Sequence, residues 1–245
     1  MIRVFLFFLL FSLSASGADR IVSLSPALSE LLFYLGAKNR VVGVSNYCTA
    51  KECKGKVKVG GIVNPNVEAV LSLKPDLILC TTMTPERVCN LFRKFGVKVL
   101  RIRLVSLEDL KVALKELSRE VGAKEKGEPL VRLLRERAGE LKSCLKGKKV
   151  VVLLSLKPPI VAGRDSYIGE LLSTAGAKVI PSGTFLPVSY EFLINSKADL
   201  LISFCGCLKG LKCVDLSKEK ELFFHLSPLL IKGLGVLRRR VCLKG

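Results

Sequence analysis

A repeated segment constrains the fold of this 245-residue chain more than any other feature. Residues 30–38 read ELLFYLGAK and residues 170–178 read ELLSTAGAK, an offset of 140 residues. A second series of matches follows, in which Glu68, Lys74, Asp76 and Leu77 correspond to Glu191, Lys197, Asp199 and Leu200 at an offset of 123 residues, and Pro65 corresponds to Pro187 at an offset of 122. Because the order is kept, we predict two similar lobes, the first with an insertion of 17 residues around residues 46–61. Chance similarity between apolar helices is the alternative.

Short apolar runs alternate with amphipathic segments in both halves. The runs are rich in β-branched residues, which is typical of buried parallel strands, and we predict strands at 20–24, 40–44, 77–80, 97–102, 150–154, 178–180 and 200–204. Helical spacing predicts helices at 26–35, 66–73, 85–95, 107–121, 128–145, 167–175, 190–196 and 227–239. Each lobe is therefore predicted to be a small α/β sandwich. The helix at 128–145, about 27 Å long, is predicted to connect the lobes.

The first eighteen residues are typical of a secretory signal peptide. Arg3 precedes an apolar run from Val4 to Leu13, and small residues follow up to Ala18. This run is too short to span a bilayer, which takes roughly 20 residues, although an uncleaved anchor is the alternative. We expect cleavage near Ala18, and we predict these domains: 1–18, signal peptide; 19–122, N-terminal α/β lobe; 123–147, linker helix; 148–245, C-terminal α/β lobe.

The predicted export of the chain limits which anionic partners its positive charge can serve. Lys and Arg number 40 against 21 Asp and Glu, a net charge of +19, which favours anionic partners. Because the signal peptide directs the chain out of the cytoplasm, we expect no nucleic-acid partner. Small anionic ligands and anionic lipid remain compatible with the charge.

The cysteines are predicted to form local disulfides. There are nine, an odd number, and in an oxidising compartment at least one stays free or pairs between chains. Spacing predicts a bond between Cys48 and Cys53, and one between Cys213 and either Cys205 or Cys207. A redox or metal site at Cys205-Gly206-Cys207 is the alternative. No second close Cys pair or His completes a zinc set, so we predict no metal site.

The crevice between the lobes is the predicted ligand site, because ligands of open α/β sheets bind at the carboxyl ends of the strands. Residues that follow predicted strands supply the candidates: Ser25, Pro26, Tyr47, Ile62, Ile160, Arg164, Phe185, Glu221 and His225. Loop packing is the alternative for Tyr47 and Phe185, and a solvated turn charge for Arg164. No Gly-rich phosphate loop or Gly-x-Ser-x-Gly elbow is present, so we predict no catalytic residues.

Several segments resemble the periplasmic substrate-binding proteins of cobalamin and iron-chelate ABC importers. They are RIVSLSPALSE at 20–30, VGVS at 42–45 and NVEAVLSLKPDLI at 66–78. In the second half, Pro158-Pro159, GRDS at 163–166 and LSP at 226–228 resemble the cobalamin branch. The resemblance covers nearly the whole chain after the signal peptide. It implies an α/β fold of two Rossmann-like lobes with parallel sheets, joined by a long backbone helix, and a periplasmic location.

The resemblance also implies a partner. Glu68 and Glu191 match the family positions at which one Glu per lobe pairs with Arg on a permease subunit, which suits docking on the two-fold permease dimer of an ABC importer in the inner membrane. The alternative is that both are first-turn helix charges favoured by the macrodipole. We expect a monomer that carries a small-molecule metal chelate and no cofactor of its own.

A corrinoid such as cobalamin is the favoured ligand. Cobalamin binders of this family place aromatic residues, including Trp, around the corrin ring, whereas this chain has no Trp and carries Ile62 and Phe185 at the aligned positions. Tyr47 matches an aromatic contact. A ferric siderophore and haem, with Tyr47 or His225 as an axial ligand, are the alternatives within the family. An exported enzyme using His225 or the Cys205-Gly206-Cys207 pair, and a purely structural envelope protein, are the alternatives outside it.

Overall fold

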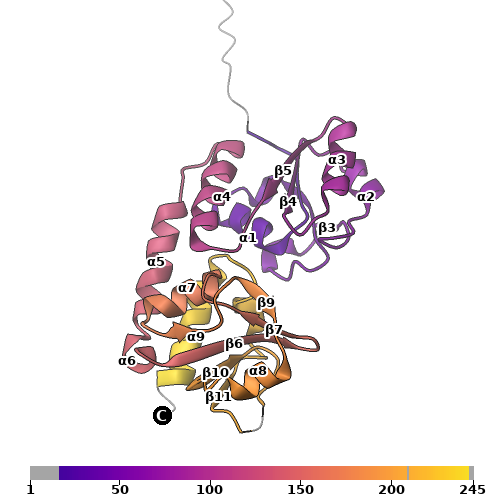
Figure 1. Ribbon diagram of the computed structural model, residues 1–245. Helices are drawn as coiled ribbons and strands as arrows, with labels where there is room; N and C mark the ends of the chain where they lie inside the picture. The colour runs from indigo at the N-terminus through magenta and orange to yellow at the C-terminus, as the bar shows by residue number, and fades with distance from the viewer. Residues whose placement is uncertain (1–16, 209, 243–245) are drawn as a thin grey trace, which may run out of the picture.

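Two α/β lobes lie one beside the other in the computed structural model, which describes residues 17–208 and 210–242 (Figure 1). Residues 1–16 of the predicted signal peptide lie outside this range. Within the described residues, no helix combines the length and the apolar character needed to cross a membrane.

The first lobe is built on a parallel sheet with the strand order β3-β2-β1-β4-β5. Its strands are β1 (Ile21–Ser23), β2 (Val41–Val44), β3 (Val57–Lys58), β4 (Leu77–Thr81) and β5 (Lys98–Ile102). Its connections hold α1 (Pro26–Tyr34), η1 (Lys38–Arg40), η2 (Lys51–Cys53), α2 (Val67–Ser72) and α3 (Glu86–Lys94). Every residue of β1 and β4 is buried, so both faces of the sheet are covered at its centre.

The second lobe has a mixed sheet with the order β11-β10-β6-β7-β9, and β8 pairs with β6. Its strands are β6 (Lys149–Leu156), β7 (Pro159–Ala162), β8 (Lys178–Val179), β9 (Phe185–Pro187), β10 (Leu200–Ser203) and β11 (Cys213–Asp215). Its helices are α7 (Tyr167–Thr174), α8 (Tyr190–Asn195), η3 (Lys220–Leu222) and α9 (Leu229–Cys242). The expectation of a parallel sheet is wrong for β7 and β9, which run antiparallel to their neighbours. Only Lys157 and Pro158 link β6 to β7, and so short a link permits only an antiparallel return.

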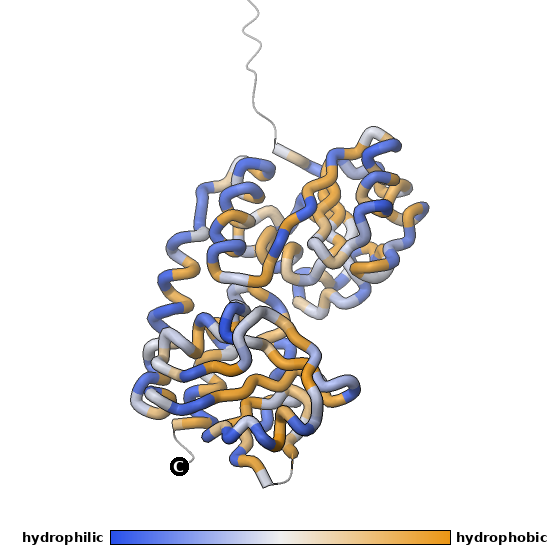
Figure 2. Tube along the Cα trace, viewed as in Figure 1, coloured by the Kyte–Doolittle hydropathy of each residue, from blue (hydrophilic) through white to orange (hydrophobic). Residues whose placement is uncertain are grey.

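Helices α4 (Leu107–Glu120), α5 (Gly127–Gly139) and α6 (Lys142–Leu145) connect the lobes. Helix α5 packs on α4 of the first lobe and on α7 and α9 of the second, and Figure 2 shows apolar and polar residues alternating along it. The long helix predicted at 128–145 is divided, because α5 ends at Gly139, a residue with low helix propensity. Helix α5 alone spans about 20 Å.

The repeat is visible in the backbone. Lys74 and Lys197, 123 residues apart, have φ of 47° and 49°, and are the only non-glycine residues with positive φ in the part of the chain that the structure describes. Two positions later, the Asp76 carboxylate accepts hydrogen bonds from the backbone N–H of Asp19 and Arg20, at the start of β1. The Asp199 carboxylate accepts one from Lys149, at the start of β6. Both halves of the chain therefore use the same turn. In both, an Asp carboxylate two residues later binds backbone N–H groups at the start of a strand, an arrangement that we call the strand clamp.

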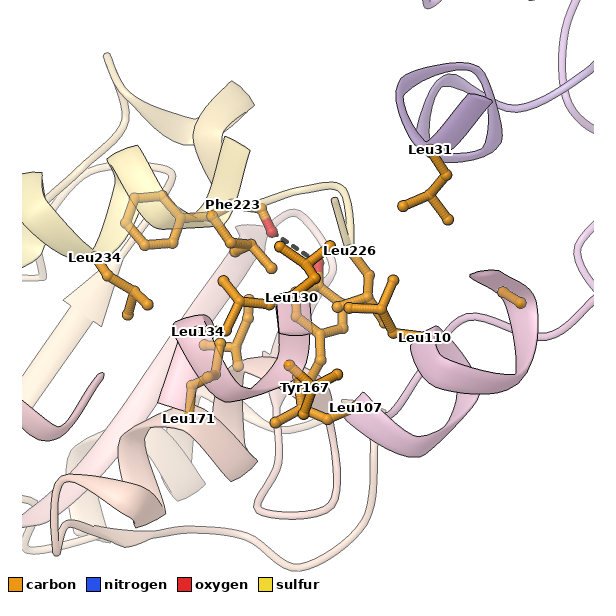
Figure 3. Packing of buried hydrophobic residues seen from close by; sticks show 14 of the residues in the cluster. Leu31, Leu107, Leu110, Leu130, Leu134, Tyr167, Leu171, Phe223, Leu226 and Leu234 are labelled. Carbon is orange, nitrogen blue, oxygen red and sulfur yellow. Dashed lines mark hydrogen bonds between the residues drawn. The ribbon is translucent and has the colours of Figure 1, made fainter. Parts of the chain in front are cut away.

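One hydrophobic core runs through both lobes. Leu31 of α1 and Leu110 of α4 belong to the same buried cluster as Leu130 of α5 and Tyr167 of α7 (Figure 3). Each of these leucines is fully buried, and burial of a leucine side chain contributes about 1.5–3 kcal/mol to folding. The two lobes are thus held together by a packed apolar interior to which α1, α4, α5 and α7 all contribute.

Three disulfides are present. Cys48 is bonded to Cys53, and Cys207 is bonded to Cys213. Cys205, the other candidate partner of Cys213, carries a free thiol. The third bond joins Cys144 of α6 to Cys242 of α9, across 98 residues of sequence, and local spacing gave no sign of it.

Candidate ligand-binding site

Two candidate residues of the first lobe, Tyr47 and Ile62, lie near the turn that follows β4. Thr84 is fully buried, and its hydroxyl donates a 2.8 Å hydrogen bond to the carbonyl oxygen of Ile62. The neighbouring Gly61 lies against the ring of Tyr47, so that a Cβ at position 61 would come within 3.6 Å of that ring. Tyr47 itself is 62% exposed. The loops after β2, β3 and β4 thus present Tyr47 and Ile62 together.

Two predicted residues of the second lobe lie on neighbouring strands. Ile160 on β7 pairs with Pro187 of β9, and Phe185 on β9 pairs with Ala162 of β7. The Phe185 ring packs edge-on against the buried Tyr167 ring, with 5.8 Å between centroids. The Tyr167 hydroxyl donates to the carbonyl of Phe223, two residues before His225 (Figure 3). This chain of contacts connects the β7–β9 edge to the segment that carries His225.

His225 connects the second lobe to α1 of the first. Its Nδ1 lies 3.3 Å from Oε1 of Glu30, a residue that is only 6% exposed. The other carboxylate oxygen of Glu30 is buried without a hydrogen-bond partner among the described residues. No hydrogen bond among the described residues involves Nε2, the other ring nitrogen of His225. Ser25 and Pro26, both buried, begin the same helix, and the Ser25 side chain makes no capping hydrogen bond.

A second polar contact crosses the lobes at α7, the repeat counterpart of α1. The Glu170 carboxylate accepts a 3.1 Å hydrogen bond from the backbone N–H of Leu107, at the start of α4. Burial raises the pKa of Glu170, and the hydrogen bond from Leu107 opposes this rise. The backbone N–H of Tyr167 donates to the carbonyl of Val105. Each of the two related helices therefore places a glutamate against the opposite lobe.

Two candidates stand apart from these contacts. Arg164 is exposed, with its guanidinium 3.5 Å from the carboxylate of Asp165 and 3.5 Å from the Ser182 hydroxyl. Glu221 is exposed on η3, and no hydrogen bond or ion pair among the described residues involves its side chain. Neither residue is tied to the groups around Tyr47 or His225.

Glu68 and Glu191 occupy the same position in their lobes. Each lies in the first turn of its helix, two residues after an N-cap: Asn66 accepts from the N–H of Ala69, and Ser189 accepts from the N–H of Phe192. Both glutamates are exposed. Neither forms an ion pair with any residue that the structure describes, so both carboxylates are available to a partner.

Other regions do not qualify as the ligand site. A cavity of about 760 Å³ lies at the amino ends of β6 and β10, lined in part by Lys148, Asp199, Lys212 and Arg240, but it holds none of the predicted ligand residues. Ligands of α/β sheets bind at the opposite end. Within residues 17–208 and 210–242, no group of three or more His, Cys, Asp or Glu residues is arranged to hold a metal ion.

Sequence reasoning missed two residues of this region. Glu30 was predicted only as part of the repeated segment 30–38 and of the segment 20–30, although a single carboxylate inside an otherwise apolar helix is the signal that would have singled it out. Thr84 had no signal, because its role depends on where Ile62 lies. Met83, beside it, is 66% exposed and joins Tyr47 among the large apolar side chains displayed at strand ends.

Two α/β lobes with connecting helices, and candidate residues at the strand ends of both lobes, define a two-lobed solute-binding protein. The chain belongs to the periplasmic binding protein family, which matches residues 21–221. It is 30% identical over 176 residues to the vitamin B12-binding protein of Salmonella paratyphi A, covering 70% of this chain and 65% of that protein. It is 29% identical over 200 residues to YvrC, an uncharacterized ABC transporter substrate-binding lipoprotein of Bacillus subtilis, covering 76% of this chain and 64% of YvrC.

The chain thus spans slightly less than two thirds of the length of these curated relatives. Solved structures share its fold at low identity. The periplasmic vitamin B12 binding protein BtuF of Vibrio cholerae matches with a TM-score of 0.71 and 18% identity, covering 93% of this chain and 98% of BtuF. A periplasmic heme binding protein of Pseudomonas aeruginosa matches with a TM-score of 0.75 and 23% identity, covering 91% of this chain and 92% of that one.

Proposed function

We propose that this protein captures a metal tetrapyrrole, with a corrinoid such as cobalamin favoured, between its lobes and delivers it to an ABC importer in the inner membrane. The observation that carries the proposal is the set of large apolar side chains left exposed at strand ends and in loops of both lobes, Tyr47, Val63 and Met83 in the first and Phe224 in the second. A contiguous exposed apolar patch marks a binding surface, and the proposal is that these side chains form such a patch between the lobes. They suit the flat apolar face of a macrocycle, and the vitamin B12-binding relatives support the corrinoid.

Haem is the second candidate, and one contact favours it. The contact between His225 Nδ1 and the Glu30 carboxylate orients the imidazole and leaves Nε2 for a metal, which is the usual arrangement for a metal-binding histidine. Cyanocobalamin already has both axial positions of its cobalt filled, whereas haemin takes axial ligands from protein. The two ligands therefore make different demands on His225.

Delivery would use Glu68 and Glu191. Their equivalent positions, exposure and lack of ion-pair partners among the described residues suit one arginine contact from each half of a permease dimer. The proposal places the protein in the periplasm, with the signal peptide removed near Ala18, and assigns it no catalytic role.

A titration of the mature protein, from residue 19, tests the function. Cyanocobalamin, haemin and several ferric siderophores are compared by visible absorbance and calorimetry in one buffer. We expect one-to-one corrinoid binding that Tyr47→Ala weakens by about 10-fold or more. Phe95→Ala, which removes an aromatic side chain of similar exposure at the end of α3, is the matched control and leaves affinity unchanged.

His225→Ala separates the two tetrapyrroles. If haem is the ligand, this variant weakens haemin binding and changes its Soret spectrum. If a corrinoid is the ligand, cyanocobalamin binding survives the substitution. Binding of ferric siderophores alone, or of nothing in the panel, contradicts the tetrapyrrole proposal.

A further inference from the structure

Two cysteines outside the described disulfides face each other inside the first lobe. Cys80 is the fourth residue of β4, and Cys89 lies in α3, which packs over the sheet. Their side chains are 0% and 1% exposed, and their Sγ atoms are 3.1 Å apart. A disulfide requires about 2.05 Å between the sulfurs, so the two thiols are about 1 Å from bonding distance.

The other cysteines leave this pair no competing partner. All nine cysteines lie among the described residues, and three disulfides use six of them. Of the remaining three, Cys205 lies in the second lobe, where its sulfur is 3.6 Å from the Ser203 hydroxyl. Cys80 and Cys89 share one buried cluster with Phe92 of the first lobe.

We propose that Cys80 and Cys89 form a fourth disulfide in the exported protein, leaving Cys205 as the single free thiol. The inference depends on the export assumed in the proposed function, because a cytosolic protein keeps its thiols reduced. The reaction is an exchange with a disulfide of the oxidising compartment, either a protein disulfide oxidant or oxidised glutathione. Two thiols lose two protons and two electrons to form the bond, and the oxidant disulfide takes them up to become two thiols.

The order of events follows from the surroundings. Burial raises the pKa of the Cys80 thiol, as does its hydrogen bond with Cys89, and exchange proceeds through the thiolate. Once α3 covers β4, neither sulfur is accessible to an oxidant. The bond therefore forms during folding after export, before α3 packs down.

The bond would reinforce the candidate ligand site. Residues 81–88, between the two cysteines, contain Thr84, whose hydroxyl holds the carbonyl of Ile62. A covalent link from Cys80 to Cys89 fixes both ends of this turn. The fourth disulfide thus ties the loop that presents Ile62 to the core of the sheet.

Disulfide mapping of the exported protein tests the inference. The protein is secreted with its signal peptide, quenched in acid, alkylated under denaturing conditions and digested with trypsin without reduction. Lys58 and Arg87 bound the peptide that contains Cys80, because Lys74 precedes a proline, and Arg87 and Arg93 bound the peptide that contains Cys89. The expected product is peptide 59–87 linked to peptide 88–93, with alkylation at Cys205 alone.

Two variants sharpen the result. Cys205→Ser is expected to keep the 59–87 to 88–93 link and to lose all alkylation. Cys89→Ser is expected to leave Cys80 alkylated while the other three disulfides persist. Alkylation of both Cys80 and Cys89 in the exported wild-type protein, beside an intact Cys48–Cys53 bond, overturns the inference, and so does a link from either cysteine to Cys205.

The mapping needs no ligand, so it fails or succeeds independently of the proposed function. Tetrapyrrole binding by a protein with alkylated Cys80 and Cys89 overturns the disulfide alone. A linked pair in a protein that binds nothing supports the disulfide and removes the ligand assignment.

Discussion

His225 Nδ1 and Glu30 Oε1 lie 3.3 Å apart, although 195 residues separate them in the sequence. The contact joins the segment before α9 to the helix that follows β1. It is one of two polar contacts described above that cross between the lobes, the other being that of Glu170 with Leu107.

Loss of this contact is expected to lower stability. His225→Ala leaves the buried Glu30 carboxylate without its histidine partner, which costs about 1–3 kcal/mol of unfolding free energy. Urea denaturation measures the change. Glu221→Ala, at an exposed position four residues earlier, is the control and changes stability by less than about 0.5 kcal/mol. Equal stabilities of His225→Ala and the wild type would show that the contact contributes nothing.

Charge reversal at Glu68 and Glu191 tests whether these glutamates dock the protein on the permease. Glu68→Lys combined with Glu191→Lys is expected to weaken binding to the reconstituted permease and to reduce transport, while ligand affinity in solution stays the same. The matched control is Glu116→Lys with Glu136→Lys, an equal charge change at exposed positions on α4 and α5. Unchanged transport in the first double variant contradicts the docking role.

The repeated strand clamps are expected to have similar effects. Asp76→Ala removes the acceptor for two N–H groups at the start of β1, and Asp199→Ala removes the acceptor for one at the start of β6. Each is predicted to cost about 1 kcal/mol of unfolding free energy, since both carboxylates are exposed. Asp76→Asn and Asp199→Asn, which keep an acceptor oxygen, should recover most of the loss. The prediction fails if only one lobe responds.

Glu170 is expected to make stability depend on pH. Burial raises its pKa above the usual 4.5, so the folded state binds more protons than the unfolded state just above that pH. Its stabilising contribution is therefore complete below about pH 4.5 and is lost as the pH rises through the raised pKa. Glu170→Gln keeps an acceptor for Leu107 and cannot ionise. The unfolding free energy of Glu170→Gln, relative to that of the wild type, should increase from pH 4 to pH 7. A difference that does not change with pH contradicts the assignment.

The bond between Cys144 and Cys242 is expected to stabilise the protein more than the bond between Cys48 and Cys53. The first closes a loop of 98 residues and the second a loop of 5. Loop-closure entropy predicts losses of about 4.7 and about 2.1 kcal/mol when each pair is replaced by serine. Thermal and urea unfolding of the two double variants give the comparison. A greater loss for the shorter loop contradicts the ranking.

Much of the architecture could be predicted because its signals are local. The strands at β1, β2, β4 and β6 and the helices α1, α3 and α7 follow from apolar periodicity and turn residues. The antiparallel edge was missed because β7 and β9 are short and their pairing depends on the tight return after Leu156. The end of α5 at Gly139 was missed because helical spacing continues through the glycine.

The candidate site likewise contains residues that could be predicted from the sequence and contacts that could not. Residues that follow strands, such as Tyr47 and Phe185, could be named because a strand end is a local property. Their neighbours could not: the contact of Thr84 with Ile62 and the packing of Phe185 on Tyr167 join segments that are distant in sequence.

The two-lobed α/β organisation, the repeat and the family could be predicted from the amino-acid sequence, because periodicity, turn chemistry and motifs are properties of neighbouring residues. The folded structure was needed to show which groups meet: His225 with Glu30 and Cys144 with Cys242, which are far apart in the sequence, and Cys80 of β4 with Cys89 of α3. The physical reason is that such contacts are set by how helices pack on the sheets and how the lobes share one core. Sequence spacing does not encode these distances.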